Sequence, residues 1–280
     1  MRRGIFVAVF VALLLVAAPA GAYDRFGPYQ TMGQLPRNWH TPYRLVGGVP
    51  LVNYGTFWAR NPVTAAQYGL ANYSIWTQDH AWIRWHAARV TADWLVRNQT
   101  RMGTWPYSFI YVPPGGGQTF APGWLSALAQ GQALSLLERV YHTTRDNRYL
   151  AAIAAGLYSL ETPVREGGLE RTYDGGLYFE EYATVGPNLS LNGDLQTLIG
   201  LYDAASVAPE AGRLFHLGVD SLAGTLQLWD SGHGYSYYSL AQRAPAPPSY
   251  NELIRVELRI LTSVSKQPSF ARYANLWSAP

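Results

Sequence analysis

Residues 127–133 read Ala-Leu-Ala-Gln-Gly-Gln-Ala, and residues 151–156 read Ala-Ala-Ile-Ala-Ala-Gly. Small side chains at these positions let neighbouring helices approach closely, because no bulky group separates the two backbones. From Ala65 onward, apolar residues recur at spacings of three and four, as they do along amphipathic helices. The sequence therefore predicts a fold built from pairs of antiparallel helices.

Eight helices are expected from this periodicity and from its proline and glycine breaks. Pro163, Pro187, Pro209 and Pro248 stand at plausible helix edges, where the missing N–H does least harm. The expected helices cover residues 63–76, 81–98, 123–144, 147–160, 190–205, 208–228, 249–264 and 268–276.

Two aromatic stretches marked by glycine lie between the helix pairs. Residues 169–182 turn at Asp174-Gly175-Gly176, and both they and residues 232–240 predict short strands or hairpins. Residues 111–122 are expected to form a loop that binds no phosphate, since no lysine completes a P-loop. Helix pairs joined by such hairpins indicate a mainly α-helical fold, an α/α toroid with its loops at one end.

The N-terminal stretch has the three parts of a secretory signal. A basic pair, Arg2-Arg3, precedes the apolar run 5–18 and the small residues that end at Ala22. The run is too short for a membrane-spanning helix, which needs about 20 apolar residues. We expect a signal peptide over residues 1–22, a secreted or otherwise extracytoplasmic protein, and one catalytic domain over residues 23–280 that lies outside the membrane.

Composition narrows the class of ligand. The chain has no cysteine, so no disulfide is expected, and without the signal its 19 basic residues nearly balance 18 acidic ones, which makes nucleic acid an improbable partner. Tyrosine and tryptophan are abundant, with 20 and 10 residues, whereas charged residues are only 14%. These aromatic side chains line either a wide core between helices or a sugar-binding cleft, and composition alone favours neither.

Several kinds of site are not expected. The six histidines show no metal-binding spacing, so we predict no metal and no cofactor. His86 and His216 lie in helical pattern and are more often structural than ligands. A nucleophile elbow of the Gly-x-Ser-x-Gly type is also missing from the sequence.

Residues 178–182, Tyr-Phe-Glu-Glu-Tyr, carry the strongest chemical signal, and Asn192-Gly193 follows at the start of the next helix. A carboxyl group in an apolar cleft has a raised pKa, which suits it to proton transfer. The alternative is an edge hairpin whose acids face water. Tyrosines at 235, 237, 238 and 250 form a further group, although alternating tyrosines on a strand are more often core residues.

These residues resemble the D-glucuronyl C5-epimerases, and the similarity runs in order from about residue 45 to 275. The stretches that carry it are Asn61–Leu70, Ala92–Gln99, Pro122–Gln132, Glu180–Tyr182, Leu191–Gly193, Leu198–Asp203 and the pair Tyr238 and Tyr250. The resemblance implies an incomplete α/α toroid and a reaction that inverts C5 of glucuronate in a heparan-type polymer, giving iduronate.

The resemblance also implies site residues. The family's catalytic positions fall on Glu181, Tyr182, Tyr238 and Tyr250. We expect Glu181 and Tyr250 to act from opposite faces of the sugar, and Tyr182 and Tyr238 to stabilise the negative charge that builds on its carboxylate. The residues expected to bind substrate are Gln67, Tyr68, Trp124, Gln130, Asn192 and Arg243.

The sequence departs from the family pattern in three places. A β-rich domain between the first two matching stretches is missing, since about 23 residues separate them. After Tyr238 the family's Asp-Leu-Arg is replaced by Ser-Leu-Ala, so the arginine expected near the substrate carboxylate is missing unless Arg243 or Arg255 substitutes for it. Residues 251–255 also lack the family's histidines.

The residues leave other functions open. A polysaccharide lyase removes the same C5 proton and then expels the 4-linked sugar. A glycoside hydrolase needs two carboxyl groups about 5 to 10 Å apart, for which the candidates are Asp174, Glu180, Glu181 and Asp230. A non-catalytic carbohydrate-binding protein is the remaining alternative. The expected partner is a uronate-containing polysaccharide substrate, and the oligomeric state is left open.

Overall fold

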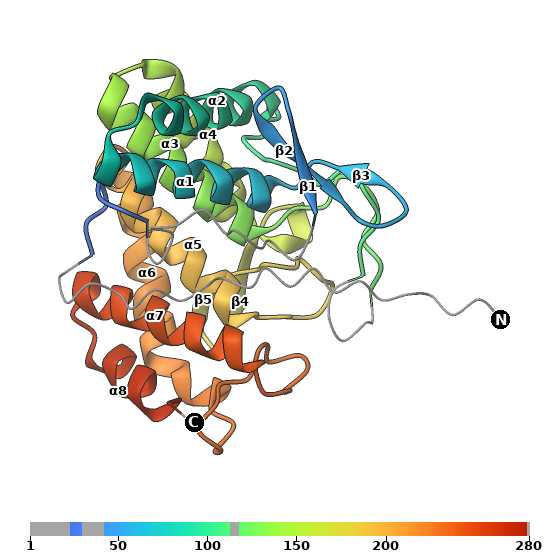
Figure 1. The fold of residues 1–280 in the computed structure, drawn as a ribbon. Coiled ribbons are helices and arrows are strands. Elements are labelled where there is room, and N and C mark those ends of the chain that lie inside the picture. Colours follow the sequence, from blue (N-terminus) through green and yellow to red (C-terminus); the bar gives the residue numbers. More distant parts are fainter. Residues whose placement is uncertain (1–22, 30–41, 113–117, 279–280) are drawn as a thin grey trace.

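The computed structural model describes residues 23–29, 42–112 and 118–278, and the signal peptide predicted over residues 1–22 lies outside the described residues. Eight α-helices and five short strands make up the described part (Figure 1). The helices are α1 (Pro62–Asp79), α2 (Trp82–Asn98), α3 (Ala127–Thr144), α4 (Asn147–Glu161), α5 (Leu191–Ala204), α6 (Pro209–Thr225), α7 (Pro248–Ser265) and α8 (Pro268–Leu276). The strands are β1 (Tyr43–Val46), β2 (Val49–Asn53), β3 (Trp58–Ala59), β4 (Glu170–Tyr173) and β5 (Gly176–Phe179).

The helices form an inner row and an outer row. Helices α1, α3, α5 and α7 pack side by side, and each packs against the next helix in the chain, α2, α4, α6 or α8. In Figure 1, α1 and α3 lie in the upper part of the molecule, with α5 and then α7 below them. The prediction of a mainly helical fold built from helix pairs is confirmed.

The described N-terminal segment, residues 23–29, connects the two ends of the inner row. The backbone N–H of Tyr23 donates to Ser263 of α7 at 3.2 Å, and that of Tyr29 donates to Ser74 of α1 at 2.8 Å. The Tyr23 hydroxyl donates to Asp203 at 3.0 Å, and Asp203 forms a buried ion pair with Arg139 of α3 at 2.6 Å. The segment is therefore an integral part of the helical domain.

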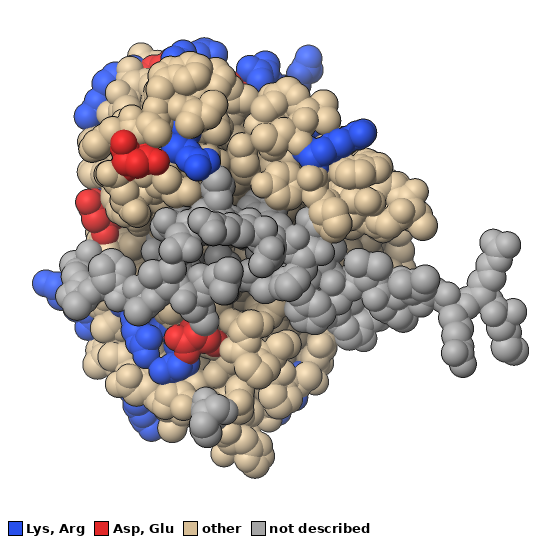
Figure 2. Space-filling model, in the orientation of Figure 1, with Lys and Arg blue, Asp and Glu red and all other residues tan. Residues whose placement is uncertain are grey.

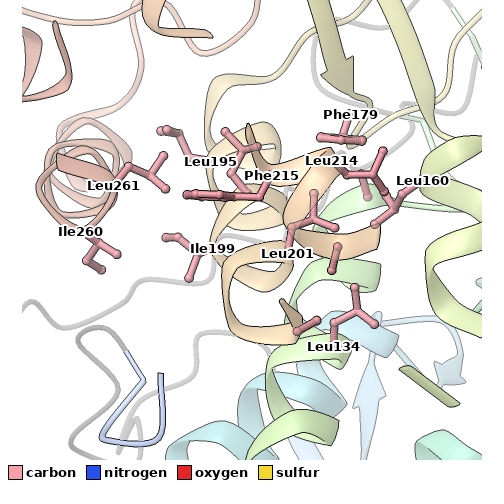
Figure 3. Close-up of a cluster of buried hydrophobic side chains, with 14 of the residues drawn as sticks. Leu134, Leu160, Phe179, Leu195, Ile199, Leu201, Leu214, Phe215, Ile260 and Leu261 are labelled. Carbon is pink, nitrogen blue, oxygen red and sulfur yellow. The ribbon is translucent and has the colours of Figure 1, made fainter. Parts of the chain in front are cut away.

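The contact between α3 and α5 is the tightest in the row. Gly131 and Gly200 face each other so closely that a Cβ on Gly200 would lie 2.2 Å from the Gly131 carbonyl oxygen. This is the close approach that the small side chains of residues 127–133 predict. On the other side of α5, Leu195, Phe215 and Leu261 meet in a core made by α5, α6 and α7 (Figure 3).

Two predicted helix boundaries and one predicted strand segment are wrong. Helix α3 begins at Ala127 instead of 123, because the Ser126 side chain caps it by accepting from the Ala129 N–H. Residues 226–229 form a separate 3-10 turn after α6. Residues 232–240 make only isolated bridges, since Gly232 and Gly234 adopt positive φ angles that break a strand.

Only one of the two small sheets was predicted. Strands β4 and β5 pair antiparallel around Asp174-Gly175, as the hairpin prediction requires. The antiparallel sheet β1-β2-β3 was not predicted.

Charged side chains are scattered over the face drawn in Figure 2 and do not gather in one patch. Among the described residues, none of the helices is both long and apolar enough to cross a membrane.

Candidate active site

One cavity opens at the end of the toroid where the inner helices begin. Side chains from the first turns of α1, α3, α5 and α7 line it, together with Glu181 and Tyr182 after β5. The N-terminal end of a helix carries a partial positive charge of about half a unit, so four such ends make the cavity attractive to an anion. Among the described lining residues there is no Lys, Arg or His.

The paired acids after β5 separate into two roles. Glu180 points away from the cavity, where it accepts from Arg171 at 2.9 Å and from the backbone N–H groups of Asn188 and Leu189 at 3.0 and 2.9 Å. Glu181 lines the cavity. Glu180 is therefore a structural group that holds the chain between β5 and α5, which leaves Glu181 as the acid available for chemistry.

The packing around Glu181 explains the glycine at position 193. A Cβ at Gly193 would lie 2.4 Å from the Cβ of Glu181, so no larger residue fits there. Ser190 caps α5 by accepting from the Gly193 N–H at 3.2 Å, and its hydroxyl donates to Glu181 Oε2. The start of α5 therefore fixes the position of the Glu181 carboxyl group.

Glu181 lies among three tyrosines. The Tyr238 hydroxyl donates to Glu181 Oε2 at 3.3 Å, and the rings of Tyr238 and Tyr250 meet edge to face at 5.6 Å. Tyr182 and Tyr250 line the same cavity, whereas Tyr238 reaches it through Glu181. The four residues predicted to be catalytic, which are up to 69 positions apart in the sequence, thus gather at one site.

Burial sets the ionisation of this group. Burial raises the pKa of Glu181, and the hydrogen bonds from Ser190, Tyr182 and Tyr238 only partly oppose this rise. Burial and the nearby Glu181 charge raise the pKa of Tyr182, Tyr238 and Tyr250. The phenols therefore stay protonated at neutral pH and act as hydrogen-bond donors, while the carboxyl group is a stronger base than an exposed glutamate.

An aromatic wall faces these groups. Trp124 stacks on Tyr107 with ring centroids 3.7 Å apart, and on Tyr111 at 5.0 Å. Tyr111 in turn stacks on Tyr182 at 5.7 Å, and their hydroxyl oxygens lie 3.5 Å apart. Flat aromatic faces suit the apolar face of a sugar ring, so the abundant tyrosine and tryptophan do line a cleft as well as fill the core.

The residues predicted to bind substrate divide into two groups. Gln67, Trp124 and Asn192 line the cavity. Tyr68, Gln130 and Arg243 are not among its lining residues. Tyr68 packs against Tyr43 with ring centroids 6.3 Å apart, and neighbouring positions on a helix point about 100° apart, which explains why Gln67 and Tyr68 differ.

Gln130 and the arginines have other surroundings. The Gln130 amide accepts from the Trp105 N–H at 3.1 Å and donates to the carbonyl oxygens of Gly103 and Gly156, so it joins α3 to its neighbours. Arg243 is exposed on the loop before α7. Arg255 donates to Glu252 and to the Ala274 carbonyl, on the side of α7 that faces α8.

Sequence reasoning missed most of the other lining residues, among them Tyr107, Tyr111, Gln132 and Gln196, and it missed Glu257, which accepts from Asn192 and Gln196. Two of them carried a usable signal. Gln196 follows Asn192 by four positions and Glu257 follows Tyr250 by seven, spacings that place each pair on one helix face. The tyrosines carried none, because residues 99–126 have no regular pattern.

Comparison with known proteins bears on the residues that surround the cavity. A family model described as D-glucuronyl C5-epimerase C-terminus matches residues 98–279, which include all four predicted catalytic positions. The chain belongs to the D-glucuronyl C5-epimerase C-terminus family. Helix α1, which contributes Gln67, lies outside the matched residues.

Two relatives of this epimerase family chain cover parts of it. D-glucuronyl C5-epimerase from Caenorhabditis elegans is 34% identical over 166 residues, 54% of this chain and 27% of the nematode protein. An uncharacterized protein from Methanocaldococcus jannaschii is 27% identical over 179 residues, 62% of this chain and 56% of the archaeal one. The chain thus spans about a quarter of the one protein's length and about half of the other's.

Solved structures support the fold of this family member. A family 76 glycoside hydrolase from a bovine Bacteroides thetaiotaomicron strain superposes with a TM-score of 0.52 and 12% identity, covering 80% of this chain and 48% of that one. A polysaccharide lyase superposes with a TM-score of 0.50 and 14% identity, covering 76% and 57%. Both are α/α toroids, which confirms the predicted architecture; at such identity the likeness shows the fold alone.

Proposed function

We propose that the chain is a uronosyl C5-epimerase that inverts C5 of D-glucuronate residues to L-iduronate in a heparosan- or heparan-like polysaccharide. The observation that carries the proposal is the gathering of one desolvated carboxyl group, Glu181, and three phenols, Tyr182, Tyr238 and Tyr250, at one cavity with an aromatic wall. Membership of the D-glucuronyl C5-epimerase C-terminus family supports it.

The reaction needs a base on one face of the sugar and an acid on the other. In the proposed mechanism, Glu181 removes the C5 proton, and the electrons of the C–H bond move into the adjacent carboxylate to form an enolate. Tyr182 donates a hydrogen bond to an enolate oxygen, Tyr238 orients the Glu181 carboxyl group with the hydrogen bond that it donates to it, and Tyr250 returns a proton to the opposite face of C5. Exchange with solvent then deprotonates Glu181 and reprotonates Tyr250, so the enzyme returns to its starting state.

The surroundings match the demands of each step. Burial raises the pKa of Glu181, which makes its carboxylate a better proton acceptor. Burial likewise raises the pKa of Tyr182, which keeps this phenol a donor while charge builds on the substrate. Since the described lining residues include no cation, the four helix ends supply the positive potential that an arginine would otherwise give.

We also propose that the protein is exported. The support is the sequence of residues 1–22, with its basic pair, apolar run and small residues before Tyr23. An extracellular polysaccharide as substrate agrees with export. Comparing the mass of the protein secreted by its host with that of the full chain tests this part, and a retained N-terminus would contradict it.

The proposed reaction is tested by incubating the protein with heparosan in D₂O and following C5 by NMR. Deuterium at C5 in both glucuronate and iduronate is expected. An unsaturated uronate that absorbs in the ultraviolet would indicate a lyase instead, new reducing ends a hydrolase, and glycan binding without exchange a carbohydrate-binding protein. Any of these three results would refute the epimerase proposal.

Variants separate the two faces of the sugar. Tyr250→Phe is expected to block the return of a proton to one face, and Glu181→Gln its removal from the other. Tyr158→Phe is the matched control, because Tyr158 is 51% exposed on α4, outside the cavity. Equal formation of iduronate by Tyr250→Phe and the control would show that Tyr250 is not the acid, since deuterium exchange alone needs only Glu181.

A further inference from the structure

A network of amide groups and one buried carboxyl group forms the floor of the cavity. Asn192 Nδ2 donates to Glu257 Oε1 at 2.9 Å, and Gln196 Nε2 donates to the same oxygen. Gln132 Nε2 donates to Gln196 Oε1 at 3.1 Å, and the Tyr29 hydroxyl donates to that oxygen at 2.9 Å. The network therefore joins three inner helices, α3, α5 and α7, directly below the site.

Glu257 fixes the direction of every amide in this network. Its Oε1 accepts two N–H groups whether the acid is ionised or neutral, so the NH₂ groups of Asn192 and Gln196 must turn toward α7. The Gln196 carbonyl oxygen then faces Gln132, which must present its own NH₂ group. The orientation of all three amides follows from one buried acid, whose pKa burial raises well above the usual range.

Because the network uses the NH₂ groups of the amides, their carbonyl oxygens remain as acceptors at the cavity. Gln132 and Asn192 both line it, and the NH₂ group of each is already engaged. Gln132 Oε1 is buried and accepts no hydrogen bond from the part of the chain that the structure describes. A buried carbonyl oxygen without a donor is costly, by about 1 to 3 kcal/mol in proteins, unless a ligand supplies one.

We propose that this floor is a subsite for the hydroxyl edge of a sugar ring, with Gln132 and Asn192 as acceptors and Glu257 as the residue that positions them. The inference rests on the proposed function and deepens it. Sugar hydroxyls donate to carbonyl oxygens, whereas a carboxylate is repelled by them. In a hexuronate the C2 and C3 hydroxyls lie across the ring from C5, so holding them at the floor turns C5 and its carboxylate toward Glu181 and the phenols.

Two polymers test the proposal. Heparosan carries the carboxylate, and carboxyl-reduced heparosan keeps the ring hydroxyls but has an alcohol at C6. If the floor binds hydroxyls, Gln132→Met weakens the binding of both polymers by the same factor, about 2- to 12-fold for one hydrogen bond. A loss confined to heparosan would show that Gln132 faces the carboxylate, and no loss with either would show that it faces no substrate; both results overturn the proposal.

Further variants test the positioning role of Glu257. Glu257→Leu removes the acceptor of the Asn192 and Gln196 amides and is expected to weaken the binding of both polymers. Glu257→Gln keeps an acceptor oxygen and is expected to restore part of the affinity. Equal losses in these two variants would overturn the positioning role. Gln227→Met is the matched control, because Gln227 is exposed and donates only to the Gly224 carbonyl.

Failure of the subsite proposal can be distinguished from failure of the proposed epimerase function. Wild-type protein that binds both polymers but exchanges no C5 deuterium would refute the epimerase activity and leave the floor to be decided by the variants. Wild-type protein that binds neither polymer would overturn both proposals. If Glu257→Leu does not fold, the comparison of Gln132→Met with Gln227→Met on the two polymers still decides the matter.

Discussion

Replacing Gly200 by alanine tests the contact that holds the toroid together. The added Cβ would lie 2.2 Å from the Gly131 carbonyl oxygen and 2.5 Å from its Cα, so α3 and α5 must separate by about 1 Å to restore ordinary contact. Overpacking of this kind costs about 1 to 3 kcal/mol, and backbone atoms that cannot turn aside place the cost at the upper end. Alanine also favours the helix by about 1 kcal/mol over glycine. The expected net loss is about 2 kcal/mol of unfolding free energy.

The control is the same substitution where space exists. Gly212 lies inside α6, and a Cβ there would meet only Ala205 Cβ, at 3.6 Å. Gly212→Ala should therefore raise the unfolding free energy by about 0.5 to 1 kcal/mol. Urea unfolding of the two variants, followed by circular dichroism, measures both effects. Equal midpoints for Gly200→Ala and Gly212→Ala would refute a backbone-tight contact between α3 and α5.

The same variant should disturb the site. Gln132 follows Gly131 on α3, and Asn192 and Gln196 lie on α5, so a shift of about 1 Å between the helices changes the cavity floor. Misplacement of that size can cost about 100-fold in rate. We expect the C5 exchange of Gly200→Ala to fall well below that of Gly212→Ala at a temperature where both are folded. Unchanged C5 exchange in Gly200→Ala would show that the contact between α3 and α5 does not determine the geometry of the site.

Three further predictions concern single side chains. Glu181→Gln should lower C5 exchange by about 10²- to 10⁴-fold in the NMR assay while the fold stays intact, because the amide oxygen still accepts from Ser190. Burial raises the pKa of Asp194 to about 8, so the folded state keeps a proton that the unfolded state loses near pH 4, and unfolding free energy should fall between pH 4 and 8. Asp194→Asn should remove that part of the fall in urea titrations at several pH values; an unchanged slope would contradict the raised pKa. Gln130→Met should cost about 1 to 3 kcal/mol in the same titrations yet leave the KM for heparosan unchanged, since its partners are the Trp105 backbone N–H, two backbone carbonyls and the Ser159 hydroxyl.

Much of the fold could be predicted because apolar residues recur at helical spacings from Ala65 onward, with proline and glycine breaks between the helices. The prediction failed where local chemistry overrides that pattern, as at Ser126, whose side chain begins α3 four residues after the predicted start. It also failed at residues 232–240, where two glycines with positive φ angles prevent the alternation of a strand. Strands β1 to β3 are only two to five residues long, which is too short for a period of two to stand out.

The site was predicted unevenly for a different reason. Glu181, Tyr182, Tyr238 and Tyr250 were proposed from a resemblance that covers short stretches in order, and the structure brings them together. The resemblance could not say which neighbour in a stretch faces inward. Gln130 and Gln132 differ by two positions on α3, or about 200° around the helix, so one joins helices and the other lines the cavity.

The arrangement of the cavity also bears on the missing arginine. A fixed cation beside the substrate would stabilise the carboxylate before and after proton removal, whereas only the extra stabilisation of the enolate speeds the reaction. In the proposed mechanism, the phenol of Tyr182 strengthens its hydrogen bond as charge moves onto the enolate oxygen that it contacts. Beside an aromatic wall this gain is larger than in water, because the local dielectric is lower. If both proposals hold, neutral donors at the carboxylate and neutral acceptors at the hydroxyl edge provide stabilisation and orientation with no arginine among the described lining residues.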